Sequence, residues 1–79
     1  MIEELDAVVL TRDVTENSLN EGDVGTVVHA YEDEEAFEVE FVSADGSTIG
    51  VLTLSKADIR PIRGREILHV RDLARAATA

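Results

Sequence analysis

The chain has 79 residues, no cysteine and a formal net charge of −10. A domain of this size supports one small hydrophobic core, and without cysteine neither a disulfide nor a thiolate metal site can stabilise it. The acidity disfavours binding to the phosphate backbone of nucleic acids, and it favours either simple solubility or a basic protein partner.

The charge is distributed unevenly along the chain. Residues 1–58 carry 15 acidic side chains against Arg12 and Lys56, whereas residues 59–79 carry 5 arginines against Glu66 and Asp72. We interpret residues 1–62 as the folded domain and residues 63–79 as an arginine-containing extension. The first residues are acidic where a secretory signal needs basic ones, and the apolar runs are too short to span a membrane. We therefore expect a cytoplasmic protein.

Five short segments have the composition of β-strands, and they are bounded by turn residues. They are Ala7–Thr11, Val24–Tyr31, Ala36–Val42, Thr48–Leu54 and Ile59–Ile62. The fourth segment is apolar on both faces, which predicts either burial or a contact surface on its second side. Pro61 has no N–H to donate, so the last strand is expected at an edge of the sheet.

The third segment gives the clearest pattern. Phe37, Val39 and Phe41 alternate with Glu38 and Glu40. Because successive strand side chains point to opposite faces, the aromatic and aliphatic residues are expected in the core and the glutamates outside it.

Four residues are predicted to have structural roles in turns. Gly22 and the Asp45-Gly46 pair lie where a tight turn needs positive φ, and Gly25 is expected at a bulge or a close strand crossing. A phosphate-binding loop is disfavoured here, because Asp23 would repel an anion and no lysine follows. Residues 13–23, which include Gly22, are predicted to form a loop with the side chains of Val14 and Leu19 tucked beneath it.

These elements predict a mostly β fold, a small five-stranded SH3-like barrel, followed by a C-terminal helix. Residues 64–79 contain strong helix formers and no turn signal, which favours a helix over Arg65–Ala76. Such a short helix is marginal alone, so it must pack on its own domain, a second copy or another protein. The residues that would make this contact are Ile67, Leu68, Val70 and Leu73.

Several of these segments together resemble a known family. The segments Leu5–Leu10, Gly22–Val28, Phe37–Phe41 and Leu52–Leu54, with Tyr31, resemble a family of small bacterial proteins catalogued as a domain of unknown function. The resemblance covers Leu5 to Pro61 and implies an SH3-like barrel. It also implies, by analogy, an antitoxin or immunity role, because members of such families are often encoded beside small toxin or nuclease genes.

Six carboxylates around the second and third strands are the candidate partner-binding residues. They are Glu32, Asp33, Glu34, Glu35, Glu38 and Glu40. A calcium site is disfavoured because the Asp/Asn-Gly spacing of an EF-hand is absent, and a catalytic carboxylate pair would need an apolar pocket. We favour a negative strip that meets a basic partner.

No catalytic, cofactor-binding or metal-binding residues are predicted. His29 and His69 are the only histidines, and neither has partners at the spacing of a zinc site or a catalytic triad. Our first hypothesis is a non-enzymatic protein-interaction module that binds a basic protein partner, with residues 65–76 as a clamp. The alternative is a self-assembling structural domain, a homodimer sealed by the extension. A KOW-type nucleic-acid binder is least favoured, because basic residues and exposed aromatics are few.

Overall fold

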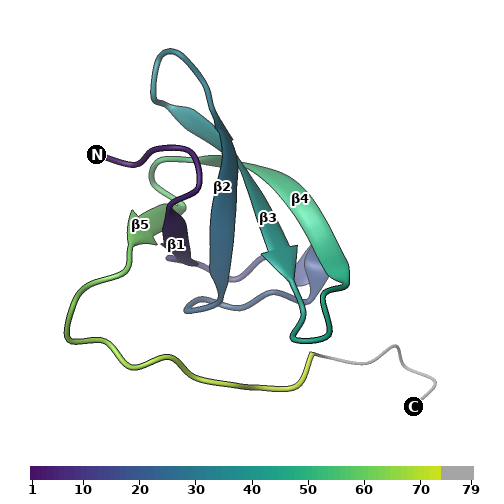
Figure 1. Cartoon of the computed structure of the whole chain (residues 1–79). Coiled ribbons are helices and arrows are strands. Elements are labelled where there is room, and N and C mark those ends of the chain that lie inside the picture. The colour runs from purple at the N-terminus through teal and green to yellow at the C-terminus, as the bar shows by residue number, and fades with distance from the viewer. Residues whose placement is uncertain (74–79) are drawn as a thin grey trace.

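The computed structural model of the chain describes residues 1–73, which form a mostly β fold (Figure 1). Its strands are β1 (Ala7–Leu10), β2 (Val24–Ala30), β3 (Ala36–Val42), β4 (Thr48–Ser55) and β5 (Ile59–Pro61). They form one antiparallel sheet in the order β4-β3-β2-β1-β5, so that β4 and β5 are its two edges. All five predicted strands are confirmed, including the position of the Pro61 strand at an edge.

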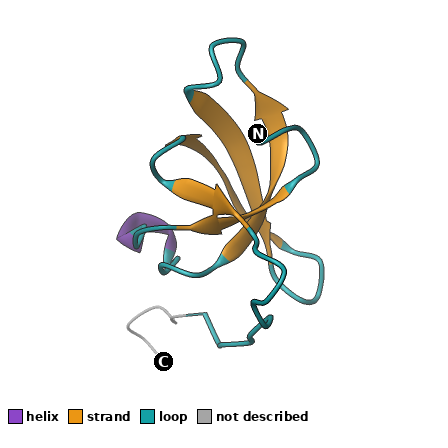
Figure 2. Cartoon of the chain, turned by 90° about the vertical axis from the view of Figure 1, so that its left-hand side faces the viewer, coloured by secondary structure: helices purple, strands orange, loops and turns teal. Residues whose placement is uncertain are grey.

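The hydrophobic core lies on one face of this strongly twisted sheet (Figure 2). Phe37, Val39 and Phe41 of β3 are all buried, as their alternation predicts. The loop between β1 and β2 contains one 3-10 turn, η1 (Thr15–Asn17), and it covers the core from one end. Val14 and Leu19 flank η1, pair with each other through both backbone amides and bury their side chains.

Strand β4 covers the core with only one of its faces. Leu54 is buried, but the side chain of Val51 is 51% exposed. Of the two alternatives that the sequence leaves for this strand, the structure therefore shows an exposed second side. The short segment between β4 and β5 is a hydrogen-bonded turn, in which the Asp58 amide donates to the Ser55 carbonyl at 2.9 Å.

The C-terminal helix predicted over Arg65–Ala76 is wrong for residues 65–73, which contain no helix; residues 74–76 lie outside the described part. This segment instead passes beneath one end of the sheet (Figures 1 and 2). Arg71 holds it there, because its guanidinium donates to both carboxylate oxygens of Asp23 and, at 3.1 Å, to the carbonyl of Ser18. A charge-assisted bidentate contact competes well with a short helix that has no partner to pack against.

No helix in residues 1–73 is long and apolar enough to cross a membrane.

Gly25 marks the closest approach of β2 to the core side chains of β3. A Cβ atom at this position would lie 2.7 Å from Val39 Cγ1 and 2.8 Å from Phe41 Cε2. Neither neighbour can move easily, because both side chains are buried in the packed core. The absence of a side chain at Gly25 therefore lets β2 and β3 curve around one core.

Replacing Gly25 with alanine should lower the free energy of unfolding by about 1–3 kcal/mol, the usual effect of overpacking a core. Urea denaturation monitored by circular dichroism measures the change as a shift in midpoint. Gly64→Ala is the matched control, because nothing lies within 4 Å of a Cβ there. Equal midpoints for the two variants would contradict this role of Gly25.

Candidate functional site

The exposed face of the sheet is centred on two glutamates of β3. Glu38 and Glu40 alternate with the core residues of this strand and are half-buried on the opposite face. Their nearest neighbours come from the strands on either side. Opposite Glu38 are His29 on β2 and Thr53 on β4, and opposite Glu40 are Thr26 and Val51.

The carboxylate of Glu38 is fixed by two hydroxyl groups. Its Oε2 accepts hydrogen bonds from Thr53 Oγ1 and from Tyr31 Oη, both at 2.6 Å. These bonds lower the pKa of Glu38, the Thr53 bond having the largest effect and the Tyr31 bond the next largest, although partial desolvation acts against them. The ring of Tyr31 is held in turn by an edge-to-face contact with His29, with centroids 4.7 Å apart. Glu38 is therefore an ionised group with a defined orientation.

Glu40 lies two residues further along β3 and is held by β4. Its Oε2 accepts a hydrogen bond from Thr48 Oγ1 at 3.0 Å. Val51, the cross-strand neighbour of Glu40, exposes half of its side chain beside it. The two carboxylates therefore have apolar surface within reach, which a partner could cover.

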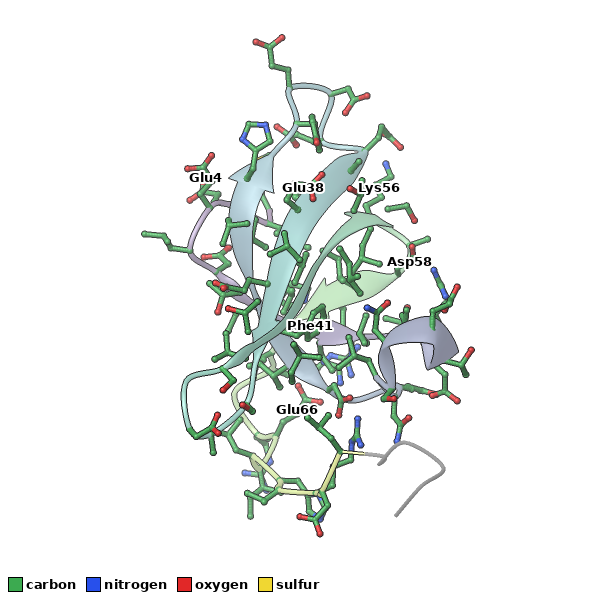
Figure 3. All side chains as sticks on the ribbon, turned by 90° about the vertical axis from the view of Figure 1, so that its right-hand side faces the viewer. Glu4, Glu38, Phe41, Lys56, Asp58 and Glu66 are labelled. Atoms are coloured by element: carbon green, nitrogen blue, oxygen red, sulfur yellow. The ribbon has the colours of Figure 1, made fainter. Side chains whose placement is uncertain are left out.

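The turn between β2 and β3 extends this negative surface beyond the end of the sheet. Glu32, Asp33 and Glu34 are exposed there, and Asp33 Oδ1 accepts the amide of Glu35 at 2.9 Å. Glu35 differs from the others, because its carboxylate pairs with Lys56 Nζ at 3.0 Å. Figure 3 shows Lys56 and Glu38 towards the same end of the molecule.

Five of the six predicted carboxylates thus have no lysine or arginine partner within residues 1–73. We call Glu32, Asp33, Glu34, Glu38 and Glu40 the acidic surface. The basic side chains that do form ion pairs bind other acids: Arg12 binds Asp58, Lys56 binds Glu35, Arg60 binds Glu66 and Arg71 binds Asp23. The pairing of Arg71 with Asp23 shows that an arginine of the extension neutralises an acid of the same molecule.

The apolar residues of the extension do not join this surface. Ile67 and Val70 are about 90% exposed, Leu68 is also exposed, and Leu73 is 38% exposed. The segment 64–73 that carries them runs beneath the opposite end of the sheet from the β2–β3 turn (Figures 1 and 3). Two hollows of about 500 and 640 Å³ lie along this segment, and both are lined by Asp23, Val24 and Arg71. The predicted clamp and the acidic surface are therefore two separate surfaces.

The predicted turn residues are also placed by the structure. Gly22 and Gly46 have φ values of 97° and 91°, which their turns require, and Asp45 Oδ1 accepts the amide of Ser47 at 3.0 Å. No cluster of three or more potential metal ligands occurs among the described residues.

Sequence reasoning missed the hydroxyl groups that orient Glu38. Tyr31 and Thr53 are distant from each other in the chain and come together only through the register of β2, β3 and β4. The one signal available in advance is that both residues lie within predicted strands, Val24–Tyr31 and Thr48–Leu54. The contact between Asp23 and Arg71, which are 48 residues apart, has no such signal.

Fold and site together define a small, mostly β domain with an acidic, hydroxyl-lined sheet face. Residues 4–61 match the model of the family described as a domain of unknown function (DUF4926), so the chain belongs to that family. This confirms the resemblance to an uncharacterised domain family. Comparison with curated proteins and with solved structures gave no match. The function must therefore be argued from the surface itself.

The carboxylate of Glu66, whose pKa is strongly lowered, anchors the beginning of the extension. Glu66 accepts two hydrogen bonds from the guanidinium of Arg60, at 2.9 and 2.5 Å, and one from the amide of Arg63 at 2.6 Å. The Arg60 bonds first, and then the Arg63 bond, lower the pKa of Glu66 from 4.5 to about 2. Because the folded pKa is depressed, this contact stabilises the fold above about pH 4.5 and is lost as the pH falls towards 2.

Carbon-detected NMR titration should therefore give Glu66 a midpoint near 2. The Arg60→Gln variant should raise that midpoint towards the ordinary glutamate value, because the largest stabilising contact of the carboxylate is removed. Arg12→Gln is the control, since Arg12 pairs with Asp58 instead. A midpoint in the wild type at the ordinary value of a glutamate would contradict the anchor.

Proposed function

We propose that this domain is a non-catalytic protein-interaction module whose acidic surface binds a basic protein partner. The observation that carries the proposal is the carboxylate of Glu38, which is ionised, oriented by two hydroxyl donors and without a lysine or arginine partner in residues 1–73. An acid that only improved solubility would not need two neighbouring side chains to fix its position.

The orientation of Glu38 favours arginine as the contacting group. Both hydroxyl bonds go to Oε2, and Oε1 accepts no hydrogen bond from any described residue. The carboxylate can thus offer Oε1 to a planar guanidinium, whose donors match carboxylate geometry. The exposed acids of the β2–β3 turn would add attraction at longer range and accelerate association.

The proposal includes an SH3-like, partly open barrel as the scaffold. Strand β1 pairs with both β2 and β5, so the last strand returns to the first, as it does in barrels of this type. The long loop around η1 covers one end of the core. This arrangement would place β2, β3 and β4 together as a curved outer face.

Within this proposal, an antitoxin or immunity-type role fits the charge of the domain. A toxin or nuclease that acts on nucleic acid needs cationic residues to hold phosphate groups. An acidic protein bound over those residues would block access to them. The same acidity makes a KOW-type nucleic-acid binder the least favoured function.

A self-assembling domain is the second candidate, and one observation favours it. Ile67, Leu68 and Val70 are exposed apolar side chains on one short segment. Burial of such side chains in a two-fold dimer would stabilise it by roughly 1.5–3 kcal/mol for each fully buried residue. This alternative makes no use of the acidic surface.

The Glu38→Gln/Glu40→Gln double variant should bind an oligo-arginine peptide about two- to thirtyfold more weakly at low salt, because each exposed ion pair contributes ~0.2–1 kcal/mol. Isothermal titration calorimetry measures the affinity. Glu16→Gln/Glu21→Gln is the matched control, since it removes the same charge from exposed positions in the first loop. Equal losses in the two double variants would show a general charge effect, and they would leave self-assembly as the better candidate.

A further inference from the structure

The two edges of the sheet are protected to very different degrees. Strand β5 has 3 residues, one of which is Pro61, which has no N–H, and another of which is Arg60. Strand β4 has 8 residues without proline, lysine or any other charge. Natural sheets usually protect an edge by shortening it or by adding proline and charge, because unpaired backbone groups attract further strands. Strand β4 has none of these protections.

The hydrogen-bond pattern identifies which residues of β4 offer their backbone groups to the exterior. The Lys56 amide donates to the Glu35 carbonyl at 3.0 Å, so these two residues form a hydrogen-bonded pair. In an antiparallel ladder, hydrogen-bonded pairs alternate with pairs that are not hydrogen-bonded. Phe37 with Leu54 and Val39 with Leu52 are therefore bonded pairs, by the observed register. The N–H and C=O groups of Val51 and Thr53, which alternate with these, point away from β3.

This exposed edge is bounded at both ends. On one side, Ser55 is already occupied, because its amide donates to Asp58 Oδ2 at 3.1 Å and its carbonyl accepts the Asp58 amide. On the other side, the register shifts between Phe41 and Val42, which interrupts the ladder beyond Gly50. Between these limits, β4 pairs with no described strand other than β3, and Val51 and Thr53 make no backbone hydrogen bond to a described residue outside the sheet.

The side chains beside this edge define what could pair with it. Val51 and Thr53 lie directly opposite Glu40 and Glu38, on the same face of the sheet. An added strand would lie roughly 4.8 Å beyond β4. An arginine or lysine on that strand can lay its aliphatic stem over the exposed Val51 and extend its charged end to the β3 carboxylates.

We propose that the edge of β4 at Val51 and Thr53 accepts an extended, antiparallel segment of the basic partner, in which arginine or lysine alternates with apolar residues. The segment adds a sixth strand to the sheet. Its basic side chains lie on the acidic surface, and its apolar side chains cover Leu52, which is half-buried at the opposite face. This inference rests on the proposed function and specifies the conformation in which the partner is bound.

A second copy of the chain fits this edge poorly. Antiparallel pairing of two β4 strands would put both pairs of Glu38 and Glu40 on one face of a continuous sheet, each only one strand from the junction. Each copy also carries a net charge of −10. Like charges so arranged oppose association, whereas an alternating basic strand neutralises them.

N-methylated peptides test the proposal without changing the protein. In antiparallel pairing, the peptide residues opposite Val51 and Thr53 point their side chains towards the acidic surface. The amides of these same residues point towards β4. A capped Val-Arg-Val-Arg-Val peptide should therefore lose at least about tenfold in affinity when its arginine amides are methylated, because backbone hydrogen bonds to β4 are lost. Methylation of the valine amides, which face solvent, should leave the affinity within about twofold.

The outcomes separate this inference from the proposed function. If the arginine-methylated peptide binds as tightly as the unmodified one, strand addition at β4 is overturned, even where Glu38→Gln/Glu40→Gln still weakens both peptides. If the double variant leaves the affinity of the unmodified peptide unchanged, the acidic surface itself is overturned. Greater loss from valine methylation would overturn the antiparallel arrangement. Dimerisation of the protein alone, abolished by the unmodified peptide, would show that a second copy occupies the edge.

Discussion

Strand β3 contributes side chains to both faces of the sheet, and its alternation of apolar and acidic residues determines how the rest of the molecule is arranged. Phe37, Val39 and Phe41 form the centre of the core, so Glu38 and Glu40 must lie on the other face. A shift of the register by one residue would bury two carboxylates and expose two aromatic rings. The same strand that stabilises this small core therefore also fixes the positions of the charged groups. The fold and the candidate site cannot vary independently.

The neighbouring strands turn these two charges into a defined surface. Thr53 and Tyr31 supply hydroxyl donors to Glu38, and Val51 provides apolar area next to Glu40. The ion pairs that the chain makes for itself lie elsewhere: Asp23 holds the extension through Arg71, and Glu66 holds it through Arg60. Internal pairing thus anchors residues 63–73 at one end of the sheet, while the acidic surface on its exposed face remains available to a partner.

Sequence patterns predict those parts of the structure that depend on near neighbours. The alternation in 36–42, the Pro61 edge and the burial of Val14 and Leu19 follow from local spacing and turn residues, and all are confirmed. The prediction of a helix in the extension is wrong because helix propensity competes there with the contact between Arg71 and Asp23, which are 48 residues apart. The hydroxyl groups around Glu38 were missed for a related reason, since they depend on the register of three strands.

Amide chemical-shift mapping of the ¹⁵N-labelled protein during titration with the Val-Arg-Val-Arg-Val peptide examines the acidic surface and the β4 edge together. The largest changes are expected at the amides of Val51 and Thr53, which would gain hydrogen bonds, with smaller changes at Glu38 and Glu40. Changes confined to the segment from Ile67 to Leu73 would contradict this account, because they would place the partner on the extension rather than on the acidic surface.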